Sequence, residues 1–154
     1  MKEAAHSESK RRRIGSPEEA LFLELLRTAE MLGRAGAQVL KSEELSATQY
    51  NVLRILRGAA EGLTCGEIGN RMITHDPDIT RLLDRLEKRG LIARNREAKD
   101  RRVVLSQITA GGLKLRARLD EPVQAMHRRQ LGHLGPERRQ QLTKLLEEAR
   151  SRAA

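Results

Sequence analysis

The fold is decided by residues 64–92, TCGEIGNRMITHDPDITRLLDRLEKRGLI, in which two short helical patterns follow each other closely. Thr64 and Glu67 have the spacing of a capping box, in which each side chain satisfies a backbone N–H group at the start of a helix. This box predicts a first helix over residues 65–72, too short to form a domain by itself.

The second pattern begins at Asp76 and Pro77, where an N-cap acid precedes a proline at the first helical position. Leucines then recur at helical spacing on one side, at Leu82, Leu83 and Leu86, until Gly90 ends the helix. A short helix, a tight connection and a longer helix predict a helix-turn-helix.

Directly behind this pair stands the basic segment RNREAKDRRVVLSQIT, residues 94–109. Leu91–Ala93 and Val103–Ile108 have the composition of strands, and the polar residues Glu97–Asp100 lie between them. These residues predict a β-hairpin with a densely basic tip. A hairpin behind a helix-turn-helix is the layout of a winged helix.

Further helical patterns begin at Ser16–Pro17, at Ser46, at Thr109 and at Gly135–Pro136. Ser46 and Gln49 form a second capping box that predicts a helix over residues 47–60, and Pro122 predicts a bend in the helix after Thr109. The first and the last two helices carry apolar stripes that one winged helix has little surface to cover. These stripes comprise Leu21, Phe22, Leu25, Leu26, Ala29, Leu32, Val39 and Leu40 in the first helix, Leu115, Leu119, Val123 and Met126 in the next, and Leu142, Leu145, Leu146 and Ala149 in the last.

The composition indicates which class of binding partner the protein has. Lys and Arg number 30 against 21 Asp and Glu among 154 residues, and the net charge of +9 favours nucleic acid or an anionic membrane surface. The aromatic residues are Phe22 and Tyr50, too few to stack unpaired bases, so double-stranded DNA is favoured. The single Cys65 excludes a disulfide framework within the chain, and no apolar run suits a signal peptide or a membrane span, so we expect a cytoplasmic protein.

With these parts in order, the chain resembles the MarR family (multiple antibiotic resistance regulators) of bacterial winged-helix transcription factors over roughly residues 17–150. The helix pair is similar to the family's helix-turn-helix, DRRVVLSQIT fits its D-x-R-x6-T wing through Asp100, Arg102 and Thr109, and TAGG opens the next helix. Ser106 stands where the family usually has an apolar strand residue, which weakens the register of this strand but not the hairpin.

The resemblance implies a mainly α fold with a small β-hairpin wing: a winged helix-turn-helix flanked by N- and C-terminal dimerisation helices. It also implies a homodimer that places two recognition helices in successive major grooves of a palindromic operator. We therefore divide the chain into a flexible basic arm (1–16), a dimerisation helix (17–45), the winged helix-turn-helix DNA-binding region (46–109) and C-terminal dimerisation helices (110–154).

Within the recognition helix, Thr80 and Arg81 match positions through which the family meets base edges and phosphates, and Arg85 and Asp78 are assigned to the same DNA-binding surface. Arg81 could clamp a guanine or a phosphate, or instead form a surface ion pair with Asp78 or Asp84. Asp78 could serve the helix dipole or accept a hydrogen bond from cytosine.

In the wing, the family pattern implies that Asp100 pins an arginine and that Arg102 enters the minor groove. Lys99 and Arg101 are then assigned to phosphates. A narrow A·T-rich groove concentrates negative potential and rewards a guanidinium group there. The alternative for this cluster is an ordinary solvated charge run.

By family analogy, a small aromatic or phenolic effector binds between the dimerisation helices and the winged helix, where Tyr50 is the candidate contact. Cys65 could act as an oxidant sensor, although a packing role is simpler. His75, His127 and His133 lack the spacing of a metal site, so we expect no metal and no cofactor.

These observations predict a sequence-specific double-stranded DNA-binding transcriptional regulator, a repressor released by a small-molecule effector. The sequence contains no catalytic constellation or phosphate-binding loop, so it does not predict an enzyme. A non-specific architectural DNA-binding protein and a redox-responsive regulator acting through Cys65 remain the alternatives.

Overall fold

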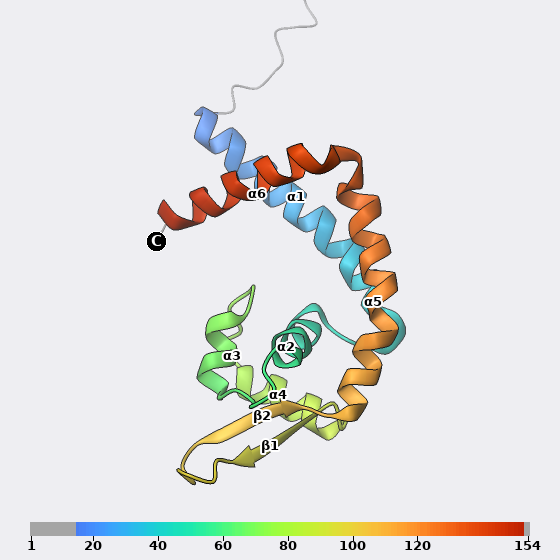
Figure 1. Ribbon diagram of the computed structural model, residues 1–154. Helices are drawn as coiled ribbons and strands as arrows, with labels where there is room; N and C mark the ends of the chain where they lie inside the picture. Colours follow the sequence, from blue (N-terminus) through green and yellow to red (C-terminus); the bar gives the residue numbers. More distant parts are fainter. Residues whose placement is uncertain (1–14, 153–154) are drawn as a thin grey trace, which may run out of the picture. The chain divides into compact units, whose positions relative to one another are not determined.

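The computed structural model describes residues 15–152 (Figure 1). The chain divides into two compact units, residues 1–34 and 35–154. The basic arm expected at residues 1–16 lies, up to residue 14, outside the described residues. The elements follow the order α1 (Pro17–Leu40), η2 (Lys41–Glu43), α2 (Ala47–Arg57), α3 (Cys65–Arg71), α4 (Ile79–Lys88), β1 (Ile92–Arg96), β2 (Val104–Ile108), α5 (Ala110–Leu131), η3 (Gly132–Leu134) and α6 (Gly135–Arg152). No helix within residues 15–152 combines the length and the apolar character needed to cross a membrane.

Helix α1 begins as the sequence predicts. The hydroxyl of Ser16 accepts a hydrogen bond from the N–H of Glu19 at 3.1 Å, and Pro17 takes the first helical position. Large apolar side chains of the first unit remain exposed on this helix, at Leu21, Phe22, Leu26 and Met31. The helix ends at Leu40 and passes into η2, whose C-cap Glu44 has the left-handed φ of 52°.

Helices α2 and α3 both carry the predicted capping boxes. Ser46 and Gln49 exchange side-chain and backbone hydrogen bonds at the start of α2, and Thr64 and Glu67 do so at the start of α3. The prediction that α2 reaches residue 60 is wrong, because the helix stops at Arg57. Gly58, whose backbone is no longer helical, donates its N–H to the carbonyl of Ile55 and closes the last turn.

Helix α4 begins later than the sequence suggested. Asp78, not Asp76, is the N-cap, and its carboxylate accepts from the N–H of Arg81 at 3.4 Å. Asp76 instead accepts from the N–H of Asp78 at 2.9 Å, an Asx turn that keeps Pro77 outside the helix. At the other end, Gly90 adopts the left-handed φ of 68° that a helix terminator requires, as predicted.

Strands β1 and β2 form the predicted antiparallel hairpin, in a register that pairs Arg94 with Ser106. Ser106 is buried, and it exchanges two backbone hydrogen bonds with Leu63, at 2.8 and 3.0 Å. A Cβ atom at neighbouring Gly62 would come within 3.0 Å of the Ser106 carbonyl oxygen. The main chain of residues 62–63 thus packs closely against the hairpin at Ser106.

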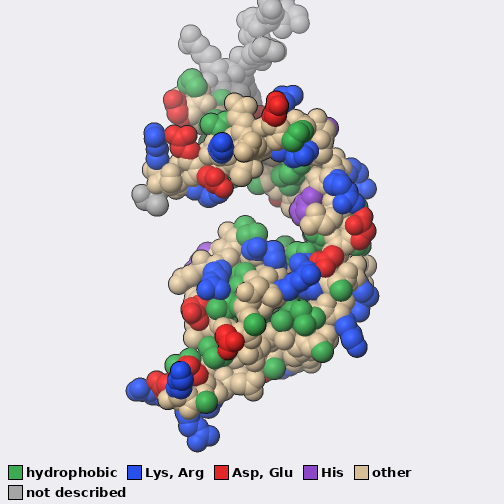
Figure 2. Space-filling model, in the orientation of Figure 1, with side chains coloured by type: hydrophobic (Ala, Val, Ile, Leu, Met, Phe, Trp, Pro, Cys, Tyr) green, Lys and Arg blue, Asp and Glu red, His purple; other side chains and the backbone are tan. Residues whose placement is uncertain are grey.

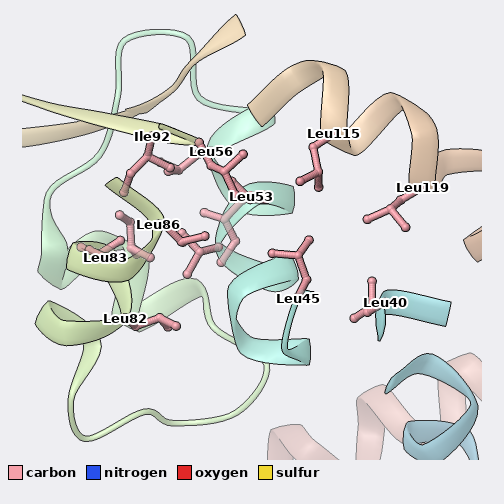
Figure 3. Packing of buried hydrophobic residues seen from close by; sticks show 14 of the residues in the cluster. Leu40, Leu45, Leu53, Leu56, Leu82, Leu83, Leu86, Ile92, Leu115 and Leu119 are labelled. Atoms are coloured by element: carbon pink, nitrogen blue, oxygen red, sulfur yellow. The ribbon is translucent and has the colours of Figure 1, made fainter. Parts of the chain in front are cut away.

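The core of the second unit joins α2, α4 and α5 to the hairpin (Figure 3). Leu53 and Leu56 of α2 and Leu86 of α4 have no exposed surface. The leucines that the sequence placed on the inner side of α4 are buried, as predicted, and the labelled side chains of Figure 3 converge between the helices. The recognition helix is therefore held by one face, and its opposite face remains available.

Helix α5 begins at the predicted cap. The hydroxyl of Thr109 accepts from the N–H of Gly112 at 3.1 Å and donates to the carbonyl of Gly90 at 2.6 Å. The helix continues through Pro122 to Leu131. Its predicted apolar stripe is buried, at Leu115, Leu119, Val123 and Met126, whereas α6 has no buried residue among those described.

Candidate nucleic-acid interface

The face of α4 opposite the core carries the predicted major-groove residues. Thr80, Arg81 and Arg85 are exposed on it, while Leu82 and Leu86 face the core. The Arg81 side chain is 76% exposed, and its Nε lies 3.2 Å from a carboxylate oxygen of Asp78. The ion pair with Asp78, one of the alternatives for Arg81, is thus present, and a largely solvated pair of this kind is weak enough to open.

A hollow of about 160 Å³ separates this face from the start of α2. Its lining combines hydroxyl, acidic and basic side chains with one leucine; the residues are Ser46, Thr48, Asp76, Asp78, Arg81, Leu82 and Arg85. Ser46 and Thr48 were not among the predicted site residues, because a capping box explains Ser46 without any functional role. Their place beside Arg81 follows from the packing of α2 on α4, which no local pattern encodes.

The tip of the hairpin gathers the predicted wing residues (Figure 2). Lys99, Arg101 and Arg102 are all exposed there, and the side chain of Arg102 is 91% exposed. Asp100 accepts from the backbone N–H of Arg102 at 3.0 Å and from its Nε at 3.2 Å. These bonds lower the pKa of Asp100, and the arginine that Asp100 holds is Arg102 itself, the residue that the wing pattern assigned to the minor groove.

Arg94 belongs to the same basic segment but does not face outward. Its guanidinium group turns to α4, where it pairs with Glu87 and Asp84. The sequence placed Arg94 in the basic cluster but offered no sign of this contact, because its partners lie in the preceding helix.

Tyr50, the predicted effector contact, is half-buried and already engaged by Arg116 of α5. The Arg116 guanidinium donates a hydrogen bond to the Tyr50 hydroxyl, and its central carbon lies 4.6 Å from the centre of the ring. Arg116 is 7% exposed, and its Nε is buried without an acceptor among residues 15–152. The carboxylate of Asp120, which Arg57 holds at 2.9 Å, lies 3.4 Å from Nη2 of Arg116.

The remaining residues singled out in the sequence are Cys65 and the histidines. Cys65 is half-buried, with its sulfur 3.9 Å from the hydroxyl of Thr80. Within residues 15–152, no three His, Cys, Asp or Glu side chains are arranged to hold a metal ion.

Comparison with known proteins agrees with this geometry. The sequence profile of the MarR family matches residues 45–104. A crystal structure of a MarR transcription factor from Planctomyces limnophilus is 42% identical with a TM-score of 0.66, over 88% of this chain and 98% of that one. The chain belongs to the MarR family. It is a DNA-binding transcriptional regulator with the winged-helix fold of that family, and not an enzyme.

Other MarR comparisons cover different shares of the chain. A mutant MarR of Escherichia coli in complex with operator DNA is 26% identical with a TM-score of 0.77, over 84% of this chain and 93% of that one. The homoprotocatechuate degradative operon repressor of Escherichia coli is 27% identical over 130 residues, which are 84% of this chain and 87% of the repressor. The regulator TtmR of Methylorubrum extorquens is 38% identical over 92 residues, which are 60% of this chain and 47% of TtmR, so the chain spans about half of that relative.

Proposed function

We propose that the chain acts as a homodimeric repressor that grips a palindromic operator and is released by a small aromatic anion. The proposed DNA contact is supported by the exposure of two basic elements on one winged helix. Arg81 and Arg85 face away from the core on α4, and Arg101 and Arg102 do so at the tip of the hairpin. In this arrangement α4 enters the major groove while the tip reaches the adjacent minor groove.

The apolar surfaces outside the winged helix support the dimer. On α1, Leu21, Phe22 and Met31 are each more than half exposed, at 61%, 58% and 61%. On α6, Leu142 and Leu145 are exposed at 41% and 56%. Such faces are costly in water, and a second copy that covers them removes the cost.

Two observations support a repressor that responds to an aromatic anion. The similar Escherichia coli protein is named a repressor of a homoprotocatechuate degradative operon, and homoprotocatechuate is a phenolic acid. In this chain, the Arg116 guanidinium is buried against Tyr50, and its Nε–H has no acceptor within the described residues 15–152. A carboxylate that reached Arg116 would compete with Asp120 and Tyr50 and so disturb the junction of α2 with α5.

Footprinting on duplexes selected from random sequence tests the operator, and binding by variants tests the site. Arg81→Ala and Arg102→Ala should each weaken operator binding by roughly 1–3 kcal/mol and leave the dimer intact. Arg129→Ala removes an equal charge from an exposed position in the last turn of α5 and serves as the control. Unchanged affinity in both site variants, or no preference for any duplex over random DNA, would contradict the proposal.

The dimer and the effector need separate measurements. Sedimentation should give about 35 kDa, twice the 17.4 kDa of one chain, and a single-chain mass at micromolar concentration would exclude the dimer. Homoprotocatechuate, with its uncharged amide as the control, should release operator DNA from the wild type and not from Arg116→Met. Release that is equal for acid and amide would exclude an anion site at Arg116.

A further inference from the structure

Arg94 lies among the basic residues of the wing but points elsewhere. It occupies the middle of β1, opposite the buried Ser106, and only 26% of its side chain is exposed. The side chain of Arg102 at the tip of the same hairpin is 91% exposed. Position in the basic segment therefore does not decide what an arginine of this hairpin contacts.

The contacts of Arg94 all reach the recognition helix. Its Nε and Nη2 donate to one carboxylate oxygen of Glu87 at 2.9 and 2.6 Å, and Nη2 also donates to Asp84 at 2.6 Å. Its backbone N–H donates to the other oxygen of Glu87 at 3.1 Å. Glu87 thus holds both the main chain and the side chain of the same wing residue.

This arrangement fixes the wing in more than one direction. A single ion pair would let the hairpin pivot, whereas Glu87 and Asp84 stand almost one helical turn apart on α4 and grip the guanidinium fork together. The partly buried pairing also raises the pKa of Arg94, mainly through its bond to Glu87. Arg85, which lies between the two acids in sequence, remains exposed.

We propose that Arg94 is a positioning residue that fixes the wing against the recognition helix and does not itself contact DNA. This role rests on the proposed operator binding, because it sets the distance between the tip at Arg102 and α4 before DNA arrives. A wing held in this way loses less conformational freedom on binding. The same contact offsets one of the two negative charges that Glu87 and Asp84 would otherwise present beside the proposed DNA-binding face.

The two consequences, positioning and neutralisation, can be separated by substitution. Arg94→Lys keeps the positive charge but cannot reproduce the fork that meets both acids. Glu87→Gln changes the acceptor of the same contact, since it keeps the shape of the side chain and removes its charge. Arg129→Lys makes the same replacement at an exposed position of α5 and serves as the control.

The first measurement needs no DNA. Amide hydrogen exchange across residues 94–106 should become about tenfold faster in Arg94→Lys and in Glu87→Gln, because a hydrogen bond to a charged group contributes that much to the protection. Exchange should be unchanged in Arg129→Lys. Wild-type exchange rates in both site variants would overturn the positioning role whether or not an operator is found.

The second measurement is operator affinity as a function of salt. Loss of a phosphate contact lowers the slope of log K against log salt by about 0.9, or about 2 for a dimer, as we expect for Arg101→Ala. Arg94→Lys should instead weaken operator binding about tenfold with a parallel slope, and lose wing protection in the footprint.

Two results would overturn the inference. A reduced salt slope in Arg94→Lys would show that Arg94 contacts DNA, and wild-type operator affinity in Arg94→Lys would show that Arg94 acts only through its charge. If the wild type itself protects no operator, the proposed function fails, and the exchange measurement still decides the role of Arg94.

Discussion

Arg118 of α5 holds the carboxylate of Glu43 in η2 through two hydrogen bonds, each 2.8 Å long. The same short helix receives the C-terminal end of α4, because Arg89 donates to the carbonyl oxygens of Glu43 and Glu44 at 2.9 and 2.8 Å. The left-handed backbone of Glu44 turns that carbonyl to Arg89. The recognition helix and the α5 helix are thus joined through one turn of the main chain.

The ion pair at this junction should make the free energy of unfolding depend on pH in the acidic range. Arg118 lowers the pKa of Glu43, and Arg94 lowers the pKa of Glu87, mainly through hydrogen bonds to each carboxylate. A carboxyl group with a lowered folded-state pKa stabilises the fold above its unfolded pKa, near 4.5, and loses this contribution as the pH falls through the folded value. Urea unfolding should therefore show a free energy of unfolding that falls as the pH is lowered from about 4.5 through the lower folded-state pKa.

Glu43→Gln identifies the source of this effect. The variant should be less stable than the wild type at neutral pH, and its stability should fall less steeply on acidification. Glu97→Gln at the hairpin is a control of the same type, because Glu97 contributes to the folded state through its backbone N–H bond to Val103. Parallel curves for wild type and Glu43→Gln would show that the bond to Arg118 does not stabilise the fold.

Thr109 links the recognition helix to α5 through its hydroxyl, which caps α5 at Gly112 and donates to Gly90. Thr109→Val keeps the volume and removes both hydrogen bonds, so it should cost about 1–2 kcal/mol of unfolding free energy. Thr109→Ser keeps the hydroxyl and should retain most of the stability. Chemical denaturation measures both, and equal losses would assign the effect to packing in place of capping.

Interactions between residues close in the chain were predictable from the sequence. Ser46 with Gln49 and Thr64 with Glu67 lie three residues apart, so both capping boxes were visible in the chain alone. At the start of α4, the prediction of Asp76 as the cap was wrong, because its carboxylate accepts from the N–H of Asp78 and forms an Asx turn outside the helix. The structure placed the cap at Asp78.

The interactions that the sequence did not reveal join residues far apart in the chain. Arg94 reaches partners seven and ten residues away, which lie in another element. Tyr50 meets Arg116 across 66 residues, so its effector role could be suggested only by family resemblance. Charge composition predicted a basic wing, but only the packing decided which of its arginines face outward.

Leu86 should be among the most sensitive positions of the core. It has no exposed surface and lies on α4 opposite the proposed DNA-binding face, so Leu86→Ala removes buried contacts and leaves a cavity. The expected cost is about 2–5 kcal/mol of unfolding free energy. Leu113→Ala, at a position 45% exposed on α5, should cost far less. Similar losses at both positions in thermal or urea unfolding would contradict this description of the core.

Gly112 gives the sharpest steric prediction, because α5 starts against the loop that leaves α4. A Cβ atom at this position would lie 2.2 Å from the carbonyl oxygen of Leu91 and 2.7 Å from a side-chain carbon of Ile108. One of these neighbours is main chain and cannot rotate away, so Gly112→Ala must displace α5 from the hairpin and should cost about 1–3 kcal/mol or more. At Gly66 in α3 an added Cβ meets nothing within 4 Å, so Gly66→Ala should be neutral or stabilise by up to about 1 kcal/mol through helix propensity. Thermal unfolding of the two variants checks the contrast, and a wild-type melting temperature for Gly112→Ala would show that α5 does not approach Leu91 as described.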